Sequence, residues 1–534
     1  MAIWSVPSLC GLRLTLALSI GLTVGACSKI GPDYQQPDIK TASHWLDGKS
    51  QPSKSGDFRR WWTIFEDPIL DHLIERAYQE NLEVQMAAVR IMEARAQLGI
   101  AKGLLLPQYA QVRADGLYEQ LSQQSPYYQG YGDYSFPYFQ TGFDTAWELD
   151  IWGKFRRGIE SSGAQLAAKT LEYDDVLVSL AAEVAAAYIQ IRTFQQRLAL
   201  AKGNAALQDR SFRIADSQFR NGLSTELDMQ QAKALRQQTL AEMANLEVGL
   251  RQSRNALCLL LGMQPSTLTR ELGDSTDIPE ARTEINVGIP AEVLRRRPDV
   301  RREAFLAAEQ SGRIGIAESE LLPRLTLVGS VSFASGSFDA IDAMNSISPS
   351  GLAGKFGPTI SWPILQFGRL KNNVRVQDAR FQALLISYQN CVLRALREVE
   401  DAMIAFHKAR ERVISLQAGV NASQRAAELA LMQYQNGLDD YTRVLNSELF
   451  LVQQQDKLTA GRSDVARSLI ALYKALGGGW EIREGQSLLP SETRKTMTQR
   501  TDWGELLDEP TAGTSKRPGN PENAEAAGHV EKAR

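Results

Sequence analysis

One long unit occurs twice in this chain, and this duplication limits the architectures that the sequence can adopt. The segment 219–223 (Phe-Arg-Asn-Gly-Leu) recurs 215 positions later as 434–438 (Tyr-Gln-Asn-Gly-Leu). Four further pairs share this spacing: Trp147/Trp362, Gly153/Gly368, Tyr173/Tyr388 and Gly262/Gly477. We therefore expect a first repeat (81–262) and a second repeat (298–477) that build the same elements.

Each repeat contains two segments in which apolar and polar residues alternate. After Pro107, the two alternating sets are Ala110, Val112, Ala114, Gly116, Tyr118 and Gln111, Arg113, Asp115, Glu119. The pattern returns at 139–150 and recurs in the second repeat at 324–333 and 356–364. A period of two predicts β-strands. Their length suits strands that cross a bilayer at a tilt, although a soluble sheet with one solvated face alternates in the same way.

The tyrosine-rich segment 121–138 between the first two strands favours the membrane interpretation, because aromatic residues gather at the interfaces of membrane barrels. Four strands cannot close into a barrel, and an open sheet edge cannot face lipid. Eight strands leave an interior filled by side chains, whereas about twelve leave a lumen. Three chains satisfy this arithmetic, and four or more also do.

A long proline-free stretch follows each hairpin. Apolar residues recur there every seventh position: Leu177, Val184, Ile191, Leu198, Ala205, Phe212, Phe219 in the first repeat, and Leu385, Val392, Val399, Phe406, Val413, Val420, Ala427, Tyr434 in the second. This period predicts coiled-coil helices of about 65 residues, or roughly 100 Å. Asn221-Gly222 and Asn436-Gly437 are the predicted reversal points, since both residue types tolerate left-handed backbone angles.

The first 26 residues are typical of a signal peptide, with Arg13 before an apolar stretch at 14–24. Val24-Gly25-Ala26-Cys27 is similar to a bacterial lipobox, and Ser28 suits sorting to the outer membrane. We expect Cys27 to carry a diacylglycerol and an N-acyl chain, which together anchor the chain firmly. A plain secretory signal with a chance cysteine is the alternative.

Composition excludes several other functions. The formal charge of −3 gives no bulk attraction to nucleic acid, and beyond the leader no window approaches the roughly 20 apolar residues of a membrane helix. The four histidines are scattered without catalytic or metal-ligand spacing, so we predict no enzyme, no catalytic residue and no metal site. We expect Cys258 and Cys391, in apolar helical surroundings, to be buried small hydrophobic residues.

Several further motifs resemble the TolC-like outer-membrane efflux proteins, specifically the lipoprotein branch called the NodT or OprM type. The shared motifs are Gly31-Pro32-Asp33-Tyr34, Trp61-Trp62, Phe65, Asp67-Pro68, Leu70, Leu73-Ile74, Asn81-Leu82 and Arg295-Arg296-Arg297-Pro298-Asp299-Val300-Arg301. The arginine run could alternatively be a basic nucleic-acid patch. Pro298 suits a first helical turn and a secreted chain meets no genome, so we interpret the run as a helix start.

The resemblance implies an α+β membrane protein in which duplicated coiled-coil helices and β-hairpins form a trimeric 12-stranded β-barrel continuous with a 12-helix α-barrel. It implies a passive efflux channel in the outer membrane, lipid-anchored and extending into the periplasm. The partners would be a periplasmic adaptor and an inner-membrane pump of the resistance-nodulation-division type. No cofactor is implied beyond the lipid on Cys27. A structural or adhesive coiled-coil lipoprotein without a lumen is the alternative.

The family resemblance also assigns segments and a gate. Residues 27–80 would be the anchored segment and first helix start, 263–297 a linker in an equatorial belt, and 478–534 an equatorial or disordered tail. The periplasmic aperture would lie just after the second reversal, at Asp439, Asp440, Tyr441, Thr442, Arg443, Asn446 and Leu449. Thr442, Asn446 and Leu449 depart from the family's leucine, aspartate and arginine. Asp439 and Asp440 would either replace the missing acidic ring or cap the returning helix.

Overall fold

The computed structural model describes residues 29–39, 42, 44–46, 58–120, 135–273, 275–280, 290–336 and 351–507. The predicted signal peptide, Cys27, most of the tyrosine-rich loop and the tail beyond 507 lie outside these residues. The chain divides into two compact units. Unit 1 comprises Met1–Asp38, Glu93–Ala168 and Glu303–Tyr388, and unit 2 comprises Ile39–Met92, Lys169–Arg302 and Gln389–Arg534.

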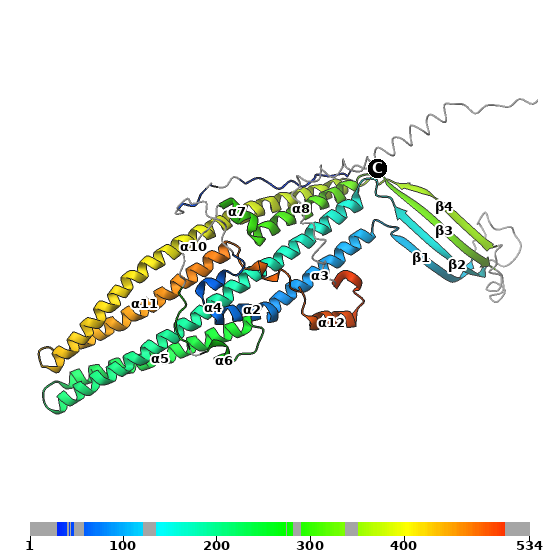
Figure 1. The fold of residues 1–534 in the computed structure, drawn as a ribbon. Helices are drawn as coiled ribbons and strands as arrows, with labels where there is room; N and C mark the ends of the chain where they lie inside the picture. The colour runs from blue at the N-terminus through cyan, green and yellow to red at the C-terminus, as the bar shows by residue number, and fades with distance from the viewer. Residues whose placement is uncertain are drawn as a thin grey trace, which may run out of the picture. The chain divides into compact units, whose positions relative to one another are not determined.

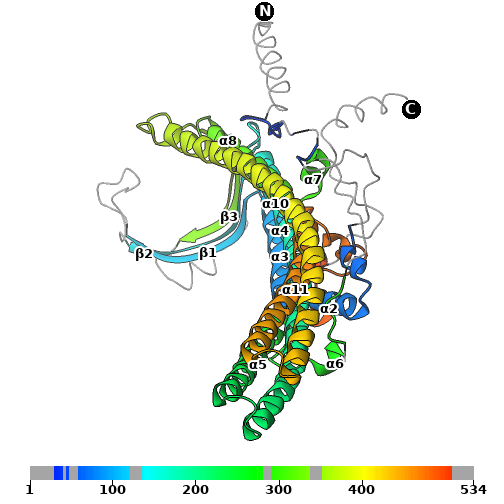
Figure 2. The ribbon, with the colours of Figure 1, turned by 90° about the vertical axis from the view of Figure 1, so that its left-hand side faces the viewer.

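Unit 1 contains a four-stranded antiparallel sheet in the order β1-β2-β3-β4 (Figure 1). The strands are β1 (Tyr109–Gln120), β2 (Ser135–Glu148), β3 (Arg324–Gly336) and β4 (Leu352–Ser361). Each strand pairs with the next along the chain, and Figure 2 shows that the sheet is curved. β1 and β4 are the two edges: β1 pairs only with β2, and β4 only with β3, among the described residues.

The register sorts the side chains into two rows of different chemistry. Val112 lies opposite Phe143, which lies opposite Val331, and all three are apolar. The neighbouring row is polar throughout and consists of Gln111, Asp144, Ser330 and Lys355. Successive side chains of a strand point to opposite faces, so one face of the sheet is apolar and the other is polar. The alternation seen in the sequence is therefore present in three dimensions.

Both return strands end earlier than predicted. Leu149 and Asp150 follow β2, and Trp362 to Ile364 follow β4. Asp150 does not extend the polar face, because its carboxylate accepts hydrogen bonds from the backbone of Phe155 and Arg156 at 3.0 Å. Pro363 has no N–H to donate to the sheet, so β4 stops before it.

The helices of the two repeats have equal lengths. The pairs are α3 (Leu82–Gly103) and α8 (Pro298–Ser319) with 22 residues, α4 (Lys154–Arg220) and α10 (Arg369–Gln435) with 67, and α5 (Glu226–Leu260) and α11 (Tyr441–Ala475) with 35. The long helices are thus close to the predicted 65 residues. α8 begins at Pro298, so the arginine run ends at a helix start as interpreted from the sequence.

In unit 2 the ends of α4 and α5 lie side by side, as do those of α10 and α11 (Figure 1). The heptad of α10 is buried at Val392, Val399 and Phe406 and again at the far end at Tyr434. α4 behaves differently: Ile191 is buried, but Phe219 is 37% exposed. A straight α-helix drifts about 20° per heptad relative to a seven-residue repeat, so the buried side of α4 moves away from the predicted positions.

One expectation about membrane helices needs correction. α4 contains an 18-residue stretch that is, by length and composition alone, apolar enough to cross a membrane. Within the described residues, 67% of that stretch is buried, as in the core helix of a soluble domain. Several alanines of α4, including Ala181, Ala182 and Ala185, are buried.

Short helices cover the sides of the long ones in unit 2. They are η1 (Trp61–Phe65), α2 (Pro68–Glu80), α6 (Thr269–Leu272), α7 (Pro290–Arg296), η3 (Trp480–Arg483), α12 (Ser491–Arg500) and η4 (Gly504–Leu507). Trp61 is 1% exposed and stacks on Tyr473 of α11 with ring centroids 5.3 Å apart. The tryptophan motif is thus a packing device. Cys258 and Cys391 are buried, as predicted, and neither forms a disulfide within the described residues.

Candidate functional site at the helix tips

The two predicted reversals form the same turn. Gly222 and Gly437 have φ angles of 74° and 69° and donate to Phe219 and Tyr434, respectively, at 2.9 and 3.0 Å. The side chains of Asn221 and Asn436 each donate to a carbonyl one turn earlier, at 2.7 and 2.8 Å. A Cβ on either glycine would meet nothing within 4 Å. Glycine is therefore needed for its left-handed backbone rather than for space.

Tyr441 lies in the core of the tip and not on its surface. It is 1% exposed and packs edge-to-face on Tyr434, with ring centroids 5.3 Å apart. Ala215, Ala232 and Val444 complete this buried cluster. The cluster joins α4, α5, α10 and α11, so Tyr441 holds the two helical hairpins together.

The two aspartates after the second turn have separate partners. Asp440 is the N-cap of α11, and its carboxylate accepts a hydrogen bond from the backbone N–H of Arg443 at 3.3 Å. Asp439 forms an ion pair with the guanidinium of Arg443. Both carboxylates lie near the positive end of the α11 dipole, where negative charge is favoured. The capping interpretation is therefore correct for Asp440.

Four of the seven predicted aperture residues line one groove of about 630 Å³. They are Asp440, Thr442, Arg443 and Asn446. Thr442, Arg443 and Asn446 are exposed, and Phe450, which is 53% exposed, lies beside them. Leu449 is half-buried and does not line the groove. Four of the predicted residues thus share one polar surface, and Asp439, Tyr441 and Leu449 do not line it.

A buried polar seam between α4 and α11 escaped the sequence analysis. Ser211 donates to Glu448 at 2.6 Å, and Asn204 donates to Gln455 at 2.8 Å. Gln208, between them on α4, is 2% exposed and its side-chain amide has no hydrogen-bond partner among the described residues. One oxygen of Glu448 is likewise unpartnered, and burial raises the pKa of this carboxyl above its usual value.

The seam had a detectable signal. Val444, Glu448 and Leu451 follow spacings of four and three along α11, which are the spacings of a buried coiled-coil stripe. An acid at the centre of such a stripe is unusual, because burying a charge without a partner is costly. The heptad positions of α4 did not predict the seam, because these residues leave the core toward the tip.

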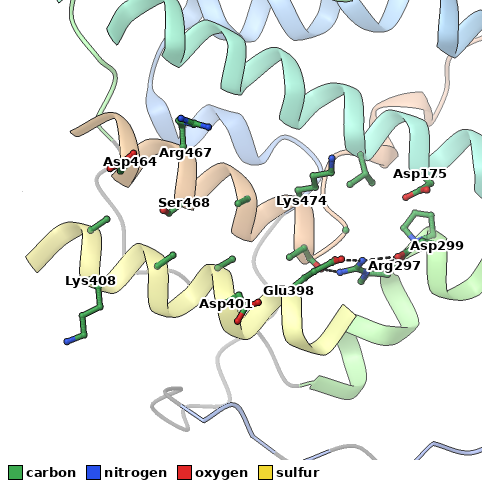
Figure 3. Close-up of a pocket in the computed structure, with 18 of the residues that line it drawn as sticks. Asp175, Arg297, Asp299, Glu398, Asp401, Lys408, Asp464, Arg467, Ser468 and Lys474 are labelled. Carbon is green, nitrogen blue, oxygen red and sulfur yellow. Dashed lines mark hydrogen bonds and ion pairs between the residues drawn. The ribbon is translucent and has the colours of Figure 1, made fainter. Parts of the chain in front are cut away.

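A second cleft of about 910 Å³ lies between α10 and α11 (Figure 3). Arg297 lies at one end, and its guanidinium donates to Asp299 at 3.0 Å and to Glu398 at 2.7 Å. It also donates to the Ala475 carbonyl at 2.9 Å. Burial alone would lower the pKa of Arg297, but the two carboxylates raise it. Arg297 of the arginine run thus ties the start of α8 to the end of α11.

The described residues contain no group of three or more His, Cys, Asp or Glu side chains placed to hold a metal ion. Across the cleft, Arg412 of α10 forms an ion pair with Asp464 of α11. This ion pair joins the two helices along the cleft.

Comparison with known proteins relates both repeats to one family. Residues 73–263 and 289–478 match the family model described as outer membrane efflux protein. Nodulation protein T of Rhizobium leguminosarum bv. trifolii is 28% identical over 454 residues, which cover 84% of this chain and 94% of the relative. The toluene efflux pump outer membrane protein TtgI of Pseudomonas putida is 30% identical over 472 residues, covering 87% and 97%.

A solved structure agrees with these similarities. The outer-membrane channel OprN is 31% identical and superposes with a TM-score of 0.77, covering 85% of this chain and 99% of that protein. The described fold, long paired helices with a few strands, is the fold of that channel.

Proposed function

The chain belongs to the outer membrane efflux protein family, and we propose that three copies of it form a conduit. It is located in the outer membrane and extends into the periplasm. It is a channel subunit of a tripartite efflux system and passively conducts small molecules from an inner-membrane pump and a periplasmic adaptor to the exterior. The pump is of the resistance-nodulation-division type.

The four-stranded sheet is the observation that supports a trimer. Its edges β1 and β4 leave backbone groups unpaired, and such edges are not stable in lipid. Its apolar face is exposed, with Val112 79% and Phe356 84% accessible. Three copies joined edge to edge would give a 12-stranded barrel with a polar lumen, and their paired helices would give the 12-helix α-barrel. The alternative of a coiled-coil lipoprotein without a lumen gains no support from the family.

Electron microscopy of the mature protein extracted in detergent tests this assembly. We expect a hollow particle with threefold symmetry. A solid rod or a compact monomer would overturn the trimeric barrel and leave the sheet as a soluble one. As the family is one of channel proteins, we assign no catalytic residue and no cofactor other than the lipid.

We further propose that the groove at the second tip forms the periplasmic aperture. Asp440, Thr442, Arg443 and Asn446 would face their copies around the threefold axis, with Leu449 nearly one turn beyond Asn446 along α11. Asp439 would hold Arg443 in place, and Tyr441 would fix α11 to its neighbours. The turns at Asn221-Gly222 and Asn436-Gly437 would form the tip that meets the adaptor.

Crosslinking of Asn446→Cys tests the aperture. A short bismaleimide should join Asn446→Cys chains into trimers and reduce the conductance of the reconstituted channel, because three thiols meet at one constriction. Lys233→Cys, on the exposed side of α5, is the matched control and should leave the conductance unchanged. Conductance that is insensitive to crosslinking at Asn446→Cys would place the aperture elsewhere.

The start of the described chain supports the lipid anchor at Cys27. Ile30 donates to the carbonyl of Trp152 at 3.1 Å, and Arg157 donates to the carbonyls of Ile30 and Gly31 at 3.0 and 2.8 Å. This contact fixes the segment where β2 passes into α4. In the sequence, Cys27 precedes this fixed segment by three residues. Its acyl chains would enter the periplasmic leaflet beside the barrel.

Mass spectrometry of the purified protein tests the anchor. We expect residues 1–26 to be removed and the mass of the mature chain to include a diacylglycerol and an N-acyl chain. Cys27→Ser should carry neither. An unmodified thiol at Cys27 in the wild type would contradict the proposal.

We also propose the following domains: 27–80 as the anchored part, 81–262 and 298–477 as the repeats, and 263–297 with 478–534 as an equatorial belt.

A further inference from the structure

The two repeats differ sharply at one place, the junction between the second strand and the long helix. In the first repeat this junction is 148–160, and in the second it is 363–375. Trp152 of the first repeat donates its indole N–H to the Pro323 carbonyl at 2.7 Å. Phe367, at the equivalent position, is 98% exposed. Ile364 and Leu365 beside it are 73% and 78% exposed.

The cations of the first junction are neutralised. Lys154 pairs with Glu148 at 3.4 Å and Arg156 pairs with Asp150 at 3.0 Å. Arg157 pairs with Glu160 at 2.8 Å. Each carboxylate belongs to the junction itself, and the N-terminal segment adds Asp33, which is 2.9 Å from Arg157.

The second junction has lost every one of these carboxylates. Pro363, Leu365 and Arg375 occupy the positions of Glu148, Asp150 and Glu160. Its cations bond only to neutral amides, Arg369 to Gln366 at 2.8 Å and Arg375 to Asn372 at 3.0 Å. Within the described part of the chain, Arg369, Lys371 and Arg375 form no ion pair, and all three are exposed.

Ile364, Leu365, Phe367, Arg369, Lys371 and Arg375 therefore form a basic-apolar patch. We propose that this patch binds the headgroups of anionic phospholipids in the periplasmic leaflet, with its apolar members in the acyl boundary. Basic residues beside exposed apolar side chains match that chemistry. The inference rests on the proposed membrane barrel, because the patch continues the apolar face of β4, where Phe356 and Ile360 are 84% and 73% exposed.

The backbone at Phe367 is consistent with a role for its exposed ring. Its φ angle is 47°, a left-handed conformation that non-glycine residues rarely adopt. Glycine would adopt this angle without strain, so an exposed phenylalanine here has no benefit for the folded chain alone. Contact of the ring with lipid gives it one.

Native mass spectrometry of the mature protein in detergent tests the proposal, with dioleoyl phosphatidylglycerol and dioleoyl phosphatidylcholine as probes. The wild type should retain phosphatidylglycerol in preference, and 1 M salt should weaken that preference. Arg369→Gln with Lys371→Gln should reduce phosphatidylglycerol retention about 25-fold at low salt, because each lost charge weakens binding about fivefold. Retention of phosphatidylcholine should not change. Phe367→Gly should lower retention of both lipids without straining the backbone.

Lys495→Gln with Arg500→Gln removes the same two charges from the exposed side of α12 and is the matched control. Retention equal to the wild type in the Arg369/Lys371 variant would overturn the proposal. Loss of trimers with unchanged lipid retention would also overturn it and make the patch a subunit contact. Symmetry and conductance of the wild type report separately on the conduit, so a failure of the patch and a failure of the proposed function give different results.

Discussion

The hydroxyl of Ser211 donates a 2.6 Å hydrogen bond to the carboxyl of Glu448, and this contact joins α4 to α11 in a buried layer close to the tip. The other carboxyl oxygen of Glu448 has no partner among the described residues, and no cation is paired with it there. The contact between the helices is consequently polar and incompletely satisfied next to the predicted aperture. A layer of this kind separates at a lower cost than an apolar one.

Glu448→Gln should stabilise the protein at neutral pH. Burial raises the pKa of Glu448 in the folded state above the usual 4.5. The protonated carboxyl therefore contributes fully to folding stability below pH 4.5, and this contribution is lost as the pH rises. The neutral amide removes this dependence. We expect a gain of about 1 kcal/mol at pH 8 and no gain at pH 4, measured by thermal unfolding. A variant that is less stable than the wild type at pH 8 would contradict this account.

Gln208→Leu should also be stabilising. The Gln208 side chain is 2% exposed and its amide has no hydrogen-bond partner among the described residues, so the fold bears a desolvation cost there. Leucine has a similar volume and no polar group, and we expect a gain of about 1 kcal/mol in the free energy of unfolding. Gln237→Leu, on the exposed side of α5, should give no gain. Destabilisation by Gln208→Leu would show that an unseen partner satisfies the amide.

Gly437→Ala should destabilise the second tip by about 1 kcal/mol, since a Cβ is strained at a φ angle of 69°. Gly203→Ala is the control, because Gly203 lies within α4 and a Cβ there meets nothing within 4 Å. That substitution should stabilise by about 0.5–1 kcal/mol. Denaturant unfolding of both variants checks the opposite signs. Equal effects would mean that the turn is not formed in solution.

Asp440 offers a separation of capping from charge. Asp440→Asn keeps an acceptor for the Arg443 N–H and should retain stability, whereas Asp440→Ala should lose about 1 kcal/mol. If the carboxylate acts only as a cap, Asp440→Asn channels will conduct and respond to divalent cations as the wild type does. We expect this result in planar bilayers. Altered cation block in Asp440→Asn would instead assign the carboxylate to the aperture.

Arg297→Lys should cost about 2 kcal/mol despite conserving the charge. Arg297 donates to Asp299 through two nitrogens, at 3.0 and 2.8 Å, and a single ammonium cannot reproduce that geometry together with the bonds to Glu398 and Ala475. Arg295→Lys, at an exposed position two residues earlier, is the matched control and should be neutral. Equal stability of the two variants would show that Arg297 acts as a point charge only.

Local patterns predicted the elements well where one physical rule controlled them. The period of two placed all four strands, and the glycines at 222 and 437 placed both reversals. The prediction was less accurate at strand ends, where Asp150 caps a helix instead of continuing the alternation. An aspartate can either cap a helix or lie on the polar face of a strand, and only the course of the backbone distinguishes the two roles.

The site was predicted less completely than the fold. The sequence placed Tyr441 beside a polar groove, but its side chain points into the buried helix cluster. Burying the aromatic ring is more favourable in free energy than exposing it to water. Leu449 was assigned from resemblance alone and lies half-buried outside the groove. The α11 side of the seam has a signal in the short window 444–451, but its α4 side depends on the drift of α4 over several heptads, which no short window of sequence reveals.

The two unpaired edges of the sheet also affect what happens in a cell that makes two versions of the chain. In the proposed trimer each edge is completed by another copy, so wild-type and defective subunits would enter the same ring. With equal amounts of both and random mixing, on the order of one ring in eight contains only wild-type subunits. A substitution that blocks the aperture while leaving β1 and β4 intact should therefore act dominantly, whereas one that prevents the sheet from forming should be recessive.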